Sequence, residues 1–194
     1  MEPLLDRLRD ADRSLFLAIN GAHDPLLDAL MRTVSMIGVW IPLYLFFLYL
    51  VRARWGARGL WWGLPVIAAM IWCTDSGSVL LFKDTVQRLR PCHTPGLEQQ
   101  VRAIAGCGGW YGFVSSHASN HFGIAVFMIG VLRRAPRWGA WALLGWAAVI
   151  AYSRVYLGVH FPADVLVGGL YGALIGTIFA LLFRRIMDRD GSRA

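Results

Sequence analysis

Residues 60–82 read LWWGLPVIAAMIWCTDSGSVLLF, a run in which Asp75 is the only charged side chain. The hydrocarbon core of a bilayer is about 30 Å thick, and a helix of about 20 apolar residues crosses it. This stretch therefore predicts a membrane-spanning helix. Similar apolar stretches lie on both sides of it.

The composition is that of an integral membrane protein. The 194 residues are 57% hydrophobic and only 16% charged, whereas a soluble domain carries about 25% charged residues. We expect one all-α domain over residues 1–194, an integral membrane bundle of about five transmembrane helices. The predicted spans are at about 30–51, 60–82, 113–132, 138–155 and 162–183.

The N-terminal segment differs from these spans. Acidic and basic side chains interrupt it, which argues against a cleavable signal peptide. Its leucines and Phe16 have a partly amphipathic helical spacing, so we expect an interfacial helix on the membrane surface.

Arginine clusters predict the orientation. The net charge of +7 comes from short clusters between the spans and not from one basic stripe, which argues against nucleic-acid binding. Such clusters gather on the cytoplasmic side of a membrane. They are Arg52, Arg54 and Arg58; Arg133, Arg134 and Arg137; and Arg184, Arg185, Arg189 and Arg193. We therefore expect the N-terminus, the 83–113 loop and the 156–161 turn at the exterior, or periplasmic, face of the cell inner (plasma) membrane.

The three cysteines fall into two groups. Cys73 lies within a predicted span, as a small buried apolar residue does. Cys92 and Cys107 flank the predicted external loop, where a disulfide would stabilise the fold by about 3 kcal/mol. Two free thiols are the alternative.

The first of three polar segments reads KDTVQRLRP over residues 83–91 and contains the only lysine of the chain. Seven residues make two helical turns, so Lys83 and Arg90 share a face if the helix continues. Two cations there bind separate phosphate oxygens. Snorkelling of long side chains at a helix end is the structural alternative.

The second segment reads FVSSHASNH over residues 113–121 and begins a predicted span. Hydroxyls and free backbone N–H groups at a helix start bind anions, and His117 is placed to donate a proton. Ser115 and Ser116 also suit a purely structural N-cap. His117 and His121 are spaced for zinc, but no third ligand is evident.

The third segment reads SRVYLGVHFPAD over residues 153–164. His160 and Asp164 are one helical turn apart, so the carboxylate can fix the imidazole tautomer and leave the other nitrogen free to attack. Arg154 adds a third cation. A structural hydrogen bond between His160 and Asp164 is the alternative.

In this order, the segments resemble the type-2 phosphatidic acid phosphatase superfamily, whose pattern is K-x6-R-P, P-S-G-H and S-R-x5-H-x3-D. The first and third match at every specified position, and the resemblance covers about residues 60–175. The middle one departs from the pattern, with Val114 in place of proline and Ser116 in place of glycine. We expect position 116 to alter substrate fit or rate.

The resemblance implies a role for each residue. His160 is the nucleophile that forms a phosphohistidine, Asp164 orients it, and His117 protonates the leaving group and later activates water. The phosphate-binding residues are Lys83, Arg90, Ser115, Ser116 and Arg154. We expect no metal or other cofactor, because fixed cations and N–H donors stabilise the transferring phosphoryl group.

We therefore expect an enzyme that hydrolyses a lipid phosphate or diphosphate at the outer face of the membrane. Undecaprenyl diphosphate is the preferred substrate, with lipid A, phosphatidylglycerol phosphate and phosphatidic acid as alternatives. A non-enzymatic lipid binder or transporter is a second hypothesis, although it would be expected to have lost His160 or Asp164. Vanadate-dependent haloperoxidases share the motifs, but they are soluble. The sequence does not indicate an oligomeric state.

Two further features have structural interpretations. Asp75 is expected to make a polar contact with Lys83 or with a neighbouring helix. Aromatic residues near the predicted interfaces are expected to be membrane anchors. These are Trp61, Trp62, Trp110, Tyr111 and Trp138.

Overall fold

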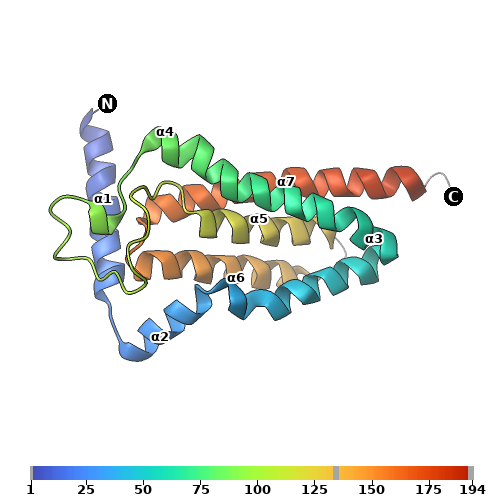
Figure 1. The fold of residues 1–194 in the computed structure, drawn as a ribbon, viewed down its shortest axis with the longest axis horizontal. Coiled ribbons are helices and arrows are strands. Elements are labelled where there is room, and N and C mark those ends of the chain that lie inside the picture. Colours follow the sequence, from blue (N-terminus) through green and yellow to red (C-terminus); the bar gives the residue numbers. More distant parts are fainter. Residues whose placement is uncertain (1, 133–135, 192–194) are drawn as a thin grey trace.

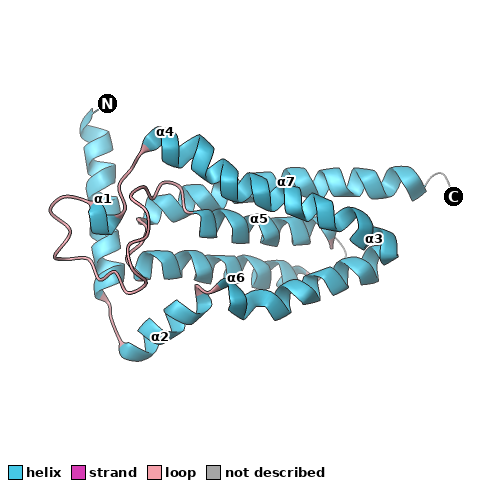
Figure 2. Ribbon diagram, in the orientation of Figure 1, coloured by secondary structure: helices cyan, strands magenta, loops and turns pink. Residues whose placement is uncertain are grey.

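The computed structural model describes residues 2–132 and 136–191, and its regular elements in these ranges are helices (Figures 1 and 2). The α-helices are α1 (Glu2–Gly21), α2 (Pro25–Val34), α3 (Ile41–Ser78), α4 (Asp84–Val86), α5 (Ser116–Val131), α6 (Arg137–Tyr156) and α7 (Pro162–Gly191). Shorter turns are η1 (Ile37–Trp40), η2 (Val79–Lys83, a π-helix) and η3 (Pro91–His93). The all-α prediction is confirmed for this part of the chain. Arg133, Arg134 and Arg193 of the predicted basic clusters lie outside it.

The long helices form a bundle, and α1 lies across one end of it (Figure 1). The central helix α5 packs against α7, α6 and α3. Two stretches of the described chain are long and apolar enough to cross a membrane, Ile37–Val86 with mean hydropathy 1.6 and Pro162–Arg189 with 2.2. The helix predicted at the N-terminus is confirmed as α1, and its place on the membrane surface stays a prediction.

The chain reverses direction within α3. Gly56 has φ 68° and ψ −169°, outside the helical region, and at this point α3 folds back (Figure 1). Glycine takes a positive φ without the steric cost that a side chain adds. The chain therefore reverses between the predicted spans at 30–51 and 60–82, and the single glycine makes the turn with helix on both sides of it.

The predicted span at 30–51 combined parts of two separate helices, α2 and α3. Asp24 caps α2 by accepting hydrogen bonds at Oδ1 from Leu26 N at 2.8 Å and from Leu27 N at 3.1 Å. The helix ends at Val34, with Ser35 as its C-cap, and α3 starts only at Ile41. The apolar pattern runs through this break and concealed it. The last helix is also longer than the predicted 162–183, because no glycine or proline follows before Gly191.

Small residues allow α5 and α7 to approach closely. Gly172 of α7 faces the backbone of Ser119 of α5, and Gly176 faces Gly123 in the same way, so a Cβ at either position would overlap the other helix. Beyond this contact, buried side chains such as Phe127 form the core of the bundle with α3 and α7. The close packing holds the start of α5 against the start of α7.

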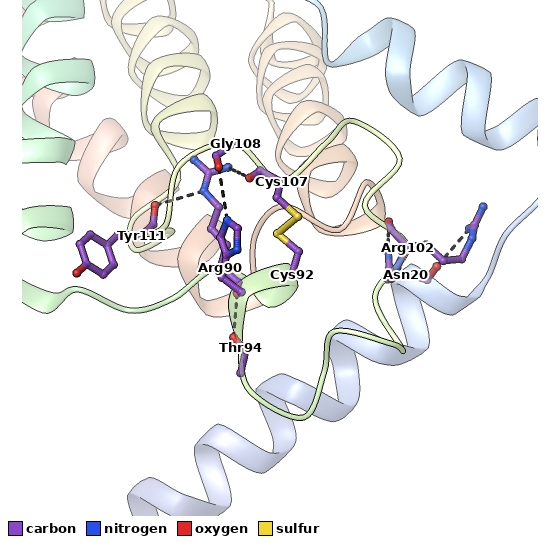
Figure 3. The surroundings of a disulfide bond; sticks show 9 residues. Asn20, Arg90, Cys92, Thr94, Arg102, Cys107, Gly108 and Tyr111 are labelled. Carbon is purple, nitrogen blue, oxygen red and sulfur yellow. Dashed lines mark hydrogen bonds between the residues drawn. A yellow bond between two sulfur atoms is a disulfide. The ribbon is translucent and has the colours of Figure 1, made fainter.

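The N-terminal helices are tied to the same end of the bundle. Asn20 is buried; its Nδ2 donates to Tyr156 O at 2.8 Å and to Arg102 O at 3.0 Å, and its Oδ1 accepts from Arg102 N at 2.8 Å (Figure 3). Asp28 of α2 accepts from the Tyr156 hydroxyl at 2.6 Å and pairs with Arg102 at 2.7 Å. The loop before α5 is thereby held over the end of α6.

The disulfide between Cys92 and Cys107 is confirmed, with a Cα–Cα distance of 6.0 Å (Figure 3). It closes the loop that follows α4. Within this loop, Leu97 is fully buried and packs with Phe16 of α1. Cys73 is a free thiol of intermediate burial. The loop is therefore fixed both covalently and by packing.

Candidate active site

A cavity of about 240 Å³ lies where η2 and α6 end and where α5 begins. Six of the eight residues predicted for the site line it, namely Lys83, Arg90, Ser116, His117, Arg154 and His160. Ile37, Asp75, Asn120 and His121 complete the lining. Segments far apart in the sequence thus bring three cations and three imidazoles to one small space.

His160 lies in the turn between α6 and α7 and is only 2% exposed. The turn depends on Gly158, whose φ is 81° and where a Cβ would lie 2.5 Å from the Arg102 carbonyl oxygen. Burial lowers the pKa of His160 from 6.5 to about 4, and the nearby Asp164 only partly offsets this effect. The imidazole is therefore neutral at pH 7, the form that can act as a nucleophile.

Asp164 is completely buried beside His160 and does not line the cavity. Its Oδ2 lies 3.5 Å from His160 Nδ1, and this nitrogen has no hydrogen bond within the described part of the chain. The same oxygen accepts from Phe161 N at 2.9 Å. The carboxylate is thus fixed by the first turn of α7 and faces Nδ1, while the imidazole itself borders the cavity. Catalytic hydrogen bonds are often long before substrate binds.

Arg88 is a site residue that the sequence analysis missed. Its Nη1 donates to Asp164 Oδ1 at 2.9 Å, and its Nη2 donates to Asp12 Oδ2 at 2.5 Å. Asp12 in turn accepts at Oδ1 from Ala163 N at 2.8 Å, in the first turn of α7. The guanidinium lies 4.2 Å from the Phe161 ring centroid. Arg88 was visible inside the first motif, but nothing in the sequence links Asp12 to it.

Lys83 and Arg90 reach the cavity by a different route from the predicted one. The helix does not continue between them, because α4 ends at Val86 and Gln87 takes a left-handed φ of 50°. Lys83 Nζ donates to Ser116 Oγ at 2.8 Å, and that oxygen is 2.7 Å from Ser78 Oγ. Ser116 stands where the family motif has glycine, and its hydroxyl therefore already accepts a hydrogen bond from Lys83.

Arg90 is held by the cross-linked loop. Its Nε donates to Tyr111 O at 3.3 Å and its Nη1 to Cys107 O at 3.2 Å (Figure 3). Its backbone N–H donates to Trp110 O at 2.9 Å. Burial lowers the pKa of this guanidinium. The loop thus sets the position of one phosphate-binding candidate.

Arg154 and Ser115 have structural partners. Arg154 Nη1 donates to the hydroxyl of Ser35, and its Nε is buried with no partner in the described residues. Ser115 is fully buried, and its hydroxyl accepts from Ala118 N at 3.5 Å as the N-cap of α5. Ser115 does not line the cavity, so its hydroxyl has the structural role of an N-cap, the alternative given above.

The arrangement of His121 argues against the zinc alternative. Its Nδ1 donates to His117 O at 2.7 Å, which leaves Nε2 to accept from the Tyr44 hydroxyl at 3.1 Å. Both nitrogens are therefore engaged. In the described residues, the one group of three ligand side chains close enough for a metal is Cys92, His93 and Cys107, and both sulfurs belong to the disulfide.

This geometry is that of a site for a phosphate group. Three cations, Lys83, Arg90 and Arg154, line the cavity. The neutral imidazole of His160 and the imidazoles of His117 and His121 border the same space. Fixed positive charges of this kind stabilise a transferring phosphoryl group.

Comparison with known proteins agrees with a site for a phosphate group. Residues 63–188 match the PAP2 superfamily. A lipid A 4'-phosphatase from Bacteroides thetaiotaomicron is 31% identical over 188 residues, 96% of this chain and 83% of that protein. An undecaprenyl-diphosphatase from Sulfolobus acidocaldarius is 30% identical over 167 residues, 83% of this chain and 73% of that protein. The crystal structure of a transmembrane PAP2-type phosphatidylglycerolphosphate phosphatase from Bacillus subtilis shares the fold, with a TM-score of 0.70 at 23% identity over 93% of this chain and 88% of that one.

The chain belongs to the PAP2 superfamily. It is a membrane lipid phosphatase, a hydrolase of phosphate esters.

Proposed function

We propose that the chain hydrolyses a phosphate ester of lipid A, or of a closely similar glycolipid, without a metal and through a phosphohistidine. The observation that carries the mechanism is the position of His160, between the Asp164 carboxylate and a cavity that Lys83, Arg90 and Arg154 also line.

The reaction has two displacements at phosphorus. Because Nδ1 of His160 faces Asp164, Nε2 attacks the phosphorus. The N–P bond forms, the bond from phosphorus to the lipid oxygen breaks, and protonated His117 gives its proton to that oxygen. Neutral His117 then takes a proton from water, and the water oxygen attacks phosphorus. The N–P bond breaks, which frees His160 and releases inorganic phosphate. The cations stabilise the charge on the equatorial oxygens in both steps.

The relatives support lipid A over the substrate preferred from the sequence. The lipid A 4'-phosphatase matches along 96% of this chain, and the undecaprenyl-diphosphatase along 83%. Undecaprenyl diphosphate remains the second candidate, supported by that relative.

We also propose five membrane crossings. These are the two halves of α3 on either side of Gly56, then α5, α6 and α7. The end with the cavity would face the periplasm or exterior of the inner membrane, and Arg52, Arg54, Arg58 and Arg137 would lie at the cytoplasmic end. The apolar face of α1 would then rest on the outer surface of the membrane.

The test is phosphate release by the purified full chain in detergent with EDTA present. The substrates are lipid A, undecaprenyl diphosphate, phosphatidylglycerol phosphate and phosphatidic acid. We expect lipid A to have the highest kcat/KM and His160→Ala to abolish turnover. Loss of activity with EDTA would overturn the metal-free mechanism, and a higher kcat/KM for undecaprenyl diphosphate would overturn the substrate assignment.

A further inference from the structure

Two residues of the cavity have no part in this chemistry. Asp75 of α3 and Asn120 of α5 both line it, and Asn120 Nδ2 donates to Asp75 Oδ1 at 3.2 Å. Asp75 is exposed, although it belongs to the stretch 60–82 that is predicted to span the membrane. A carboxylate in a membrane-spanning segment is costly and usually has a functional reason.

The pair offers hydrogen-bond acceptors. Within the described residues Asp75 forms no ion pair, not even with Lys83, and Asn120 is the one hydrogen-bond donor to its side chain. Asn120 Oδ1 is buried and lacks a partner among the same residues. Carboxylate and amide oxygens accept hydrogen bonds from hydroxyl or amide N–H groups.

Asp75 and Asn120 lie where the part of a substrate next to the phosphate would bind. Ser116 and His117 begin α5 beside the cations, and α5 runs from there into the bundle. Asn120 follows Ser116 by one turn, or about 6 Å along the axis. A lipid whose phosphate binds the cations and whose tails enter the membrane would pass its linking group beside Asp75 and Asn120.

The cavity lining combines two kinds of polar group. Lys83, Arg90 and Arg154 present donors, whereas Asp75 and Asn120 present acceptors. A phosphate attached to a sugar satisfies both, since its oxygens accept and the neighbouring hydroxyl or amide groups donate. A prenyl chain attached directly to phosphate has no donor and would leave the buried Asn120 Oδ1 without a partner, which carries an energetic cost.

We infer that Asp75 and Asn120 form a sugar-binding subsite that selects glycosyl phosphates over alkyl and prenyl phosphates. The inference rests on the proposed function and assigns the recognition of its substrate to two residues. Asp75 and Asn120 act in specificity, and the phosphoryl transfer itself needs neither.

The test compares two substrates in the same variants, measured as purified full-length protein in detergent. Lipid A supplies a glycosyl phosphate, and farnesyl diphosphate supplies a phosphate on a prenyl chain. We expect Asp75→Asn and Asn120→Leu to lower kcat/KM for lipid A about ten- to a hundredfold, as loss of a hydrogen bond to a charged group does. For farnesyl diphosphate we expect no loss, and a gain for Asp75→Asn because a negative charge leaves the cavity.

Asp84→Asn is the matched control, because Asp84 is an exposed carboxylate beside Lys83 that does not line the cavity. It should leave the ratio of the two kcat/KM values unchanged. Equal losses on both substrates in Asp75→Asn and Asn120→Leu would make the pair merely structural and overturn the inference, as would no loss on lipid A. If the parent protein turns over farnesyl diphosphate but not lipid A, the proposed function fails instead.

Discussion

Arg88 donates to Asp164 at 2.9 Å from a guanidinium that also binds Asp12 at 2.5 Å. Asp12 of the N-terminal helix is therefore connected, through the Arg88 side chain, to the carboxylate that faces His160. The Asp164 side chain has no exposure, and Arg88 and the Phe161 N–H supply its hydrogen-bond donors.

We predict that Arg88→Ala lowers kcat at least about tenfold while KM changes little, because Asp164 and His160 lose their fixed orientation and the phosphate-binding cations stay in place. Arg88→Lys should restore only part of kcat, because an ammonium lacks the planar fork that binds two carboxylates. Asp12→Asn should give an intermediate kcat. Steady-state kinetics on a water-soluble phosphate ester measures kcat and KM separately.

Asp10→Asn serves as the control, since it removes a carboxylate from the same helix without touching Arg88. A rise in KM in Arg88→Ala with unchanged kcat would show that Arg88 binds substrate directly and would contradict the positioning role.

Ser116→Gly should raise kcat/KM several-fold. The Ser116 hydroxyl accepts a hydrogen bond from Lys83, and its removal leaves the ammonium to bind phosphate oxygens. The helix start should be less stable by about 1 kcal/mol, the usual cost of glycine in a helix. Ser116→Ala separates the two effects because it removes the hydroxyl and keeps Cβ. Lower activity in both variants would instead make the hydroxyl a phosphate ligand.

Reducing the disulfide should raise KM. The Cys107 and Tyr111 carbonyls hold Arg90, and the cross-link over 15 residues restrains the loop that carries them. Its loss should also lower the free energy of unfolding by about 3 kcal/mol. Thermal unfolding and KM, measured for Cys92→Ser and for the parent protein with and without reductant, provide the test. Cys73→Ser is the control and should behave as the parent. An unchanged KM after complete reduction would show that the packing of Leu97 is sufficient to hold the loop.

The buried His160 should make the fold less stable in acid. Its pKa falls from 6.5 to about 4 on folding, so between these values the unfolded chain binds more protons than the folded one. The free energy of unfolding should therefore decrease as the pH drops from 6.5 to 4, and at about 1.36 kcal/mol per pH unit the loss reaches about 3 kcal/mol.

The difference in unfolding free energy between the parent and His160→Gln, which does not titrate, isolates this effect. It should change between pH 6.5 and 4 in detergent solution. A constant difference across this range would mean that the imidazole is not buried in the neutral form.

The apolar stretches predicted where most helices lie, because hydropathy reports directly on burial in lipid. The same signal cannot show where one helix ends and the next begins, so the break between Val34 and Ile41 was missed, whereas the reversal at Gly56 lies in the predicted connection between two spans. The three motifs predicted the cations, both imidazoles and Asp164. The spacing of the motifs does not indicate which residues outside the motifs contact the site.

Those partners are set by tertiary packing. Arg88 meets Asp12 across 76 residues, and Asp75 meets Asn120 across 45. Ser115 and Ser116 are adjacent and of the same type, yet one caps α5 and the other lines the cavity. Which hydroxyl faces the cavity depends on the direction of the helix start, and residue type alone does not indicate it.

The bond between Asp12 and Ala163 N, 151 residues apart, also bears on biosynthesis. The N-terminal helix leaves the ribosome first, but its partner in α7 is made near the end of translation. His160 and Asp164 emerge equally late. Under the proposed mechanism, a nascent chain that lacks α7 cannot act on lipids, and the enzyme becomes competent only when its last helix is made.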